Sequence, residues 1–220
     1  MTLAELRARA RLLLDDAAGT DALWSDAEID YNINEALRQA CVRGKLLRRE
    51  DTVSVVAEQA AYELPDYFDP WQIIRVWLSS QSGIEITKRS RPELVREYCT
   101  YDLGDGASIH YRLDGRNGDG PFFIELFPTP DAADTLNIEY IAVPCPLKTE
   151  NARPEIPLYY HEKLMSGVLM LCYQKRDADT FDAHAAQRYA DEFARHFGPD
   201  YSALEMNNIQ TQQHYVIIPE

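Results

Sequence analysis

The stretch Trp24–Gly44, WSDAEIDYNINEALRQACVRG, decides the fold because it carries a complete set of helix signals. Ser25 can cap a helix, and Glu28 three residues later can complete a capping box. Gly44 is placed to adopt the left-handed conformation after the last turn. Because a single apolar stripe needs a partner, we interpret the rest of the chain as what this helix packs against. The residues of that stripe recur at helical spacing and are Ile29, Ile33, Ala36, Leu37, Ala40 and Cys41.

A second helix is expected at the start of the chain. Thr2 and Glu5 can form another capping box. The glycine in Gly19–Asp21 breaks the pattern, and Trp24 can act as a hydrophobic staple onto the next helix. These signals predict two antiparallel helices joined by a short loop. The apolar side of the first helix carries Leu3, Leu6, Ala10, Leu13 and Leu14.

The middle of the chain changes to the pattern of β-strands. A turn near Glu58-Gln59 is expected to join the first two strands, and 84–87 to pair with 71–79 as a hairpin. A short helix is expected over Pro92–Tyr98, with Ser90 as its cap. Short strands with close turns predict an antiparallel sheet, curled or sandwiched. The expected strands are 52–56, 61–64, 71–79, 84–87, 108–113, 122–127 and 136–143.

Helical periodicity returns after Pro157. Residues 164–172 are apolar on nearly all sides, which predicts a buried central helix. A last helix ends at Gly198-Pro199. The predicted fold class is therefore α+β, with a four-helix bundle from residues 1–49 and 150–206, an inserted antiparallel β subdomain at 50–149, and an extended tail at 207–220. Along the last helix, aromatic residues and one alanine recur at every fourth position, at Phe181, Ala185, Tyr189, Phe193 and Phe197.

Composition restricts the classes of function. The 220 residues are 45% hydrophobic and carry a net charge of −14, which disfavours tight binding of nucleic acid because like charges repel. The four cysteines show no metal or disulfide spacing. No apolar run approaches the roughly 18–20 residues needed to span a bilayer, and the amphipathic start does not resemble a signal peptide. We therefore expect a protein that stays in the cytoplasm in which it is made, with no membrane partner.

Motifs for catalysis, metals and cofactors are missing or incomplete. His161-Glu162 begins a zincin motif, but Met165 occupies the position of the second histidine. The loop 114–120 resembles a calcium loop, but Arg116 and Gly118 stand where ligands are needed. No nucleophile elbow, phosphate loop or dinucleotide motif is present. The sequence predicts no enzyme, no cofactor and no metal site, and a small hydrolase is the least favoured alternative.

Two kinds of segment are candidates for partner contacts. Basic runs are usually solvated faces, but they can also meet an acidic face on the next copy of the chain and so close a ring. The apolar tail segment Tyr215, Val216, Ile217 and Ile218 either packs within the chain or adds to the edge of a partner's sheet. The candidate inter-subunit basic patch is Arg43, Lys45, Arg48 and Arg49, and the second basic run is Lys88, Arg89 and Arg91.

Five segments appear in a recognisable order. They are WSDAEIDYNINEAL at Trp24–Leu37, AYELP at Ala61–Pro65, IELFPTP at Ile124–Pro130, LNIEYIAVP at Leu136–Pro144 and IPLYYHEKL at Ile156–Leu164. Their order and spacing, over the chain up to about residue 197, resemble the head-to-tail connector (adaptor) proteins of tailed bacteriophages.

The resemblance implies a structural virion protein without catalytic activity. Such proteins form a ring, usually of twelve copies, under the portal, link the capsid to the tail, and leave a channel through which the genome DNA passes without sequence-specific binding. The implied partners are the portal protein, further tail or connector proteins and other copies of the chain. The implied location is the neck of the virion, after assembly in the host cytoplasm. The resemblance also implies that the 207–220 tail serves docking. Another tail-completion or tail-tube protein is the alternative.

Overall fold

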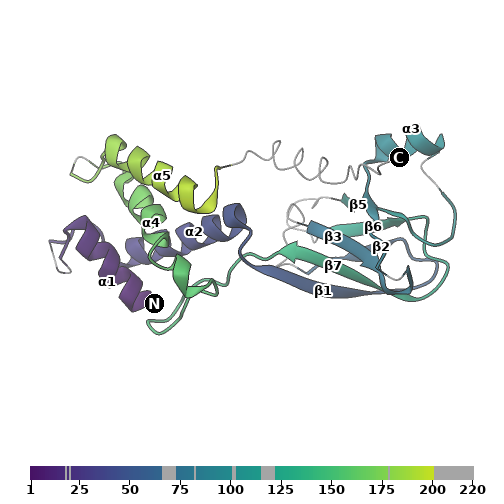
Figure 1. Ribbon diagram of the computed structural model, residues 1–220, viewed down its shortest axis with the longest axis horizontal. Helices are drawn as coiled ribbons and strands as arrows, with labels where there is room; N and C mark the ends of the chain where they lie inside the picture. The colour runs from purple at the N-terminus through teal and green to yellow at the C-terminus, as the bar shows by residue number, and fades with distance from the viewer. Residues whose placement is uncertain are drawn as a thin grey trace. The chain divides into compact units, whose positions relative to one another are not determined.

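The computed structural model describes residues 1–17, 19, 21–65, 73–81, 83–100, 103–114, 122–177 and 179–200 (Figure 1). The chain divides into two compact units. The helical unit combines Met1–Leu47 with the chain that returns at Val143, and the β unit spans Arg48–Ala142. Four of the five described α-helices belong to the helical unit and all described strands to the β unit, so the α+β fold class is confirmed.

The helical unit begins with two capped helices. In α1, Leu3–Leu14, Thr2 and Glu5 form the expected capping box, and in α2, Asp26–Gly44, Ser25 and Glu28 form the other. Each box satisfies backbone N–H groups that the first helical turn leaves without partners. The two N-terminal helices and their starts therefore follow the local sequence signals.

The end of α2 differs from its prediction. Lys45, with φ of 49°, adopts the left-handed conformation, while Gly44 is the last helical residue. A Cβ at Gly44 would lie 3.2 Å from the side chain of Leu46 and 3.5 Å from the ring of Phe197. Glycine is thus used here for close packing, and the left-handed turn is formed by the next residue.

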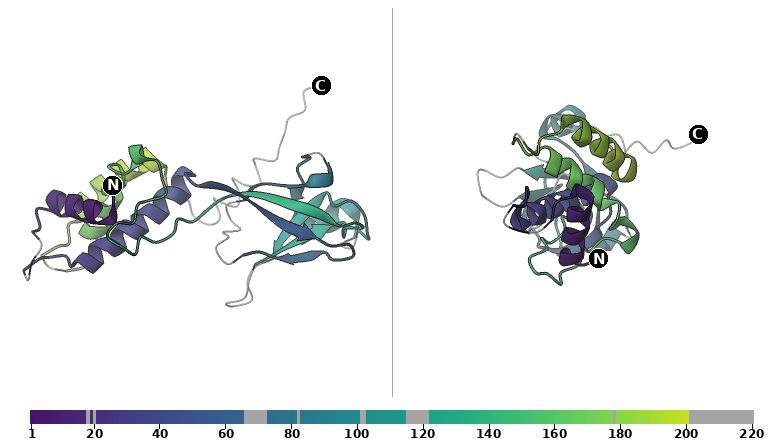
Figure 2. Two further views of the ribbon diagram at one scale, coloured as in Figure 1. Left: turned by 90° about the horizontal axis from the view of Figure 1, so that it is seen from below. Right: turned by 90° about the vertical axis from the view of Figure 1, so that its left-hand side faces the viewer.

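Helix α4, Leu164–Tyr173, is the buried centre of the helical unit (Figure 2). It contacts α1, α2 and α5, and eight of its ten residues are buried, as its apolar composition predicts. The complete apolar stripe of α2 belongs to the same core. Gly167 allows Phe193 to approach, because a Cβ there would lie 2.6 Å from the phenylalanine ring.

The last helix, α5, spans Ala183–Phe197. Its cap is Asp182, whose carboxylate accepts hydrogen bonds from the backbone of His184 and Ala185. Phe193 and Phe197 are buried as expected. Phe181 precedes the helix and is 54% exposed, so its inclusion in the last helix is wrong. The four-residue spacing extends back to Phe181, but the helix begins only after its cap at Asp182.

The β unit contains two sheets. The first has the order β1-β7-β3 and is antiparallel. The second has the order β2-β6-β5-β4, in which β4 and β5 are parallel and the other pairs antiparallel. The expectation of a purely antiparallel subdomain is therefore wrong for one pair. The strands are β1 Arg48–Val55, β2 Ala61–Glu63, β3 Ile73–Leu78, β4 Thr87–Lys88, β5 His110–Asp114, β6 Phe123–Phe127 and β7 Asp134–Ile141.

Two predicted strand pairings change because the chain passes from one sheet to the other. The turn near Glu58 leads from β1 to β2, but these strands belong to different sheets. The expected hairpin with β3 is reduced to a single bridge at Glu85 and a hydrogen bond from Ile86 N to Val76 O of 2.8 Å. The next residue, Thr87, already donates to Ile109 O of the other sheet. Helix α3, Arg91–Tyr98, follows with Ser90 at the expected cap position.

The close approach of α4 and α5 generates a prediction. Overpacking costs about 1–3 kcal/mol, which outweighs the roughly 0.5–1 kcal/mol that alanine gains over glycine inside a helix. We expect Gly167→Ala to lower the free energy of unfolding by about 1–2 kcal/mol in urea denaturation followed by circular dichroism. Gly19→Ala is the matched control, because no atom lies within 4 Å of the added Cβ. Equal stability of the two variants would contradict this packing.

Candidate functional site

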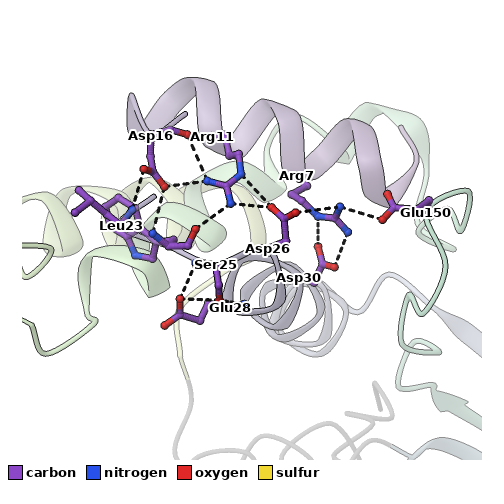
Figure 3. A network of polar contacts seen from close by, with 10 residues as sticks. Arg7, Arg11, Asp16, Leu23, Ser25, Asp26, Glu28, Asp30 and Glu150 are labelled. Atoms are coloured by element: carbon purple, nitrogen blue, oxygen red, sulfur yellow. Dashed lines mark hydrogen bonds and ion pairs between the residues drawn. The ribbon is translucent and has the colours of Figure 1, made fainter. Parts of the chain in front are cut away.

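A network of charged side chains joins α1 to α2 (Figure 3). Arg7 of α1 donates two hydrogen bonds, of 2.7 and 2.6 Å, to the carboxylate of Asp30, and a third, of 3.0 Å, to Glu150. The hydrogen bonds to Asp30 are the main cause that raises the pKa of Arg7 above its ordinary value. Because a guanidinium matches a carboxylate in geometry, this contact fixes the orientation of the two helices.

Arg11, one turn further along α1, fixes the loop between the two helices. It donates to Asp16 at 2.9 Å, to Asp26 at 2.7 Å and to the carbonyl of Trp24 at 2.9 Å. The hydrogen bond from Arg11 is also the main cause that lowers the pKa of Asp26. The buried carboxylate of Asp16 accepts bonds from the backbone N–H groups of Leu23 and Trp24. These bonds hold the backbone directly before α2 against the end of α1 (Figure 3).

An open groove of about 390 Å³ lies between α2 and the end of α4. Trp24, Ala27 and Leu171 contribute apolar surface to it, and Tyr31 is 70% exposed beside them. The indole of Trp24 is itself buried and donates to the carbonyl of Cys172 at 3.2 Å, so this part of the lining is held in place. We call this feature the α2 groove.

The polar rim of the α2 groove is an ion pair. Glu28 accepts hydrogen bonds from the N–H and hydroxyl of Ser25, and its other oxygen lies 2.9 Å from Lys175. Lys175 also donates to the carbonyl of Leu23. The backbone N–H of Ser25, followed by Lys175, lowers the pKa of Glu28 to about 2. Glu28 is therefore ionised at neutral pH and is held in position by these contacts.

A ridge of exposed apolar side chains precedes α4. Leu158 and Tyr159 lie in a short 3-10 turn, Leu158–Tyr160, and are 73% and 70% exposed. The ammonium of Lys163 lies 3.5 Å from the centre of the Tyr159 ring. Tyr160 packs against both Tyr159 and Phe197, which supports the turn from beneath. We call Leu158, Tyr159 and Lys163 the aromatic ridge.

Neither the ridge nor the groove is predicted by the sequence pattern. Periodicity singles out apolar residues that face a core, whereas Tyr31 lies outside the buried stripe of its helix and Leu158 lies outside the regular helix altogether. The available signal was the pair of large side chains directly after Pro157, ahead of the apolar run of α4.

The first basic run is divided between the two units. Arg43 pairs with Asp200 at 3.0 Å, and its side chain is only 12% exposed. Lys45 is exposed at the end of α2. Arg48 and Arg49 lie on β1, where Arg48 forms an ion pair within the β unit. Arg43 is thus already engaged inside its own unit, and the inter-subunit patch stays a prediction.

The second basic run lies where β4 leads into α3. Burial lowers the pKa of Lys88. Nearby, His110 is buried, and its two ring nitrogens lie 2.6 Å from the Thr87 hydroxyl and 2.7 Å from the Tyr98 hydroxyl. Both nitrogens are therefore satisfied, and the histidine attaches α3 to the sheet. The residues of the run are Lys88, Arg89 and Arg91.

The described residues show few features of a chemical site. Among them, no three His, Cys, Asp or Glu side chains are grouped so that they could hold a metal ion. None of the helices in this part of the chain is long and apolar enough to cross a membrane. The candidate tail segment, Tyr215–Ile218, lies outside the described residues, as do Arg116 and Gly118.

The groove rim predicts a pH-dependent stability. The pKa of Glu28 is about 2 in the folded chain, below the 4.5 of an ordinary glutamate, so its charge stabilises the fold above pH 4.5 and this contribution is lost as the pH falls towards 2. Glu28→Gln should therefore cost up to about 1 kcal/mol at pH 7, with a smaller difference from the native chain at pH 2–3. Urea denaturation at several pH values measures it. Asp179→Asn, an exposed acid-to-amide change, is the control, and a pH-independent difference for Glu28→Gln would contradict the assignment.

No curated protein matches the chain. A family model, the SU10 adaptor protein, matches residues 1–213 and so covers nearly all of the chain, including every described helix and strand. The chain therefore belongs to the SU10 adaptor protein family, a family of phage head–tail adaptors.

Proposed function

We propose that this adaptor forms a ring under the portal of a tailed phage, links the capsid to the tail and leaves a channel for the genome. The observation that carries the proposal is the family match over residues 1–213. The helical unit supports it, since it combines a rigid core with exposed apolar side chains that are suited to protein contacts. The family membership implies a structural protein rather than an enzyme.

The two units would have different tasks in the ring. We assign residues 1–49 and 150–206 to a four-helix bundle of α1, α2, α4 and α5 that carries contacts between copies. Residues 50–149 form the inserted β subdomain. The contacts of α4 with α1, α2 and α5 support the bundle.

The distribution of charge supports a channel for DNA. Residues 48–142 contain seventeen Asp and Glu against nine Lys and Arg, whereas residues 1–47 and 143–200 contain seventeen against thirteen. Most of the excess negative charge thus belongs to the β unit. An acidic channel wall repels phosphate, so DNA would pass without sticking to it.

The partners follow from this role. They are the portal protein, further tail or connector proteins and other copies of the chain, and the proposed ring contains twelve copies. The protein would assemble in the host cytoplasm and end in the neck of the virion. The tail 207–220 would dock on a partner through Tyr215–Ile218, because an apolar, β-prone segment after a polar spacer can add to a sheet edge.

Imaging tests the proposed role. Purified chain mixed with purified portal protein should give a ring of this chain beneath the portal in negative-stain images, with twelve copies by native mass spectrometry. Portal alone is the control. No association at any salt concentration would contradict the proposal. A ring on a tail tube that does not touch the portal would instead identify a tail-completion or tail-tube protein.

Truncation tests the tail. Removing residues 207–220 should abolish binding to the portal without changing the urea midpoint, because the described core ends before them. A matched variant in which the spacer 207–214 becomes glycine and serine of equal length should still bind. Equal portal binding by the truncated and full chains would contradict a docking role for Tyr215–Ile218.

A further inference from the structure

We infer that the aromatic ridge of one copy enters the α2 groove of the next copy. This inference rests on the proposed ring and names the surfaces that would join its subunits. Both surfaces belong to the helical unit, and each is complete within one chain.

The two surfaces lie at opposite ends of the helical unit. The ridge precedes the first residue of α4, whereas the groove contains Leu171 near its last turn, a separation of about 15 Å for a ten-residue helix. The groove also lies at the start of α2, while the end of α2 reaches Phe197, which packs on Tyr160 beside the ridge. Figure 1 shows the α1–α2 and α4–α5 connections together at one end of this unit and the ends of α2 and α5 at the other.

A contact between two different surfaces on identical chains is heterologous. Repeating it adds one copy after another, and the series closes into a ring when the rotation between copies permits. A contact of one surface with itself would stop at a dimer. The separation of ridge and groove therefore fits the geometry that a ring requires.

The side chains match in chemistry and size. Leu158 and Tyr159 are two of the most exposed large hydrophobic residues of the described chain, and the groove offers them the apolar surface around Trp24 and Tyr31. A volume of about 390 Å³ falls within the range of roughly 300–1,000 Å³ that accommodates ligands of several side chains' size. Tyrosine anchors in such pockets commonly dominate binding at protein interfaces.

The charges at the groove end and at the ridge end of the helical unit are also complementary. At the groove end, Lys175 and Arg176 are outnumbered by the exposed acids Asp15, Asp21, Asp177 and Asp179. The ridge end carries Lys163 over the tyrosine ring and exposed Lys45 after α2, while its exposed Glu162 is paired with Arg9. Opposite charges at the two ends favour a head-to-tail encounter and disfavour contact between like ends. A second copy of this chain is therefore the occupant that the observations favour.

Cysteine cross-linking tests the contact. In a background in which the exposed Cys99 and Cys145 are serine, one preparation carries Leu158→Cys and another Gln174→Cys. Tyr159 and Tyr31 stay intact, so the proposed anchor is kept. The two preparations are assembled together with the portal protein and treated with a short bis-maleimide, and dimers are measured by denaturing electrophoresis. The matched control replaces Gln174→Cys by Gln187→Cys, which is exposed on α5.

The inference expects cross-linked dimers in the mixture of Leu158→Cys and Gln174→Cys, at least about tenfold more than in either preparation alone or in the control mixture. A ring that assembles without this cross-link overturns the inference and leaves the proposed function intact. Cross-linking of Leu158→Cys with itself also overturns it, because the contact would then be isologous. Failure to assemble with the portal at all overturns the proposed function and the inference with it. If Ile217→Cys, used in place of Leu158→Cys, gives the dimers with Gln174→Cys instead, the groove belongs to the tail and the ridge is overturned as its occupant.

Discussion

The burial of α4 is the constraint on which the rest of the structure depends. This helix is apolar on nearly every side and is covered by α1, α2 and α5, which come from both ends of the chain. The chain must therefore leave the helical unit after Leu47 and return to it at Val143. The entropic cost of closing a loop rises only slowly with the length of the loop. A folded β unit can therefore be inserted between the two segments that form the helical unit. The division of the chain into two units follows from this single long-range contact.

Local signals made much of the fold predictable. The capping boxes at Thr2 and Ser25 and the buried stripe of α2 depend on residues a few positions apart, and all of them are present. The errors depend on partners far along the chain. Gly44 is small because Phe197 lies near it, and β4 leaves the neighbourhood of β3 for the other sheet. Spacing within a segment carries no information about such neighbours.

The candidate contact surfaces were harder to predict for a related physical reason. Periodicity identifies the apolar residues that a core will cover, while Tyr31, Leu158 and Tyr159 are defined by the fact that packing leaves them exposed. Charge runs give an equally incomplete picture. Arg43 belongs to a basic run in the sequence, but Asp200 and the ring of Phe193 occupy it within the helical unit. Only the folded chain distinguishes a charge that is already paired from one that is available to a partner.

The proposed contact also accounts for how exposed apolar side chains can be tolerated before assembly. Each copy would offer one ridge and one groove, a small surface that gives weak association between free chains. A portal that holds several copies side by side raises their effective concentration, so the same weak contact becomes sufficient once the copies are gathered. In a closed ring every groove is filled and no ridge remains exposed, whereas an open chain of copies leaves one of each. Closure would therefore be favoured over continued growth by the same interaction that joins neighbours.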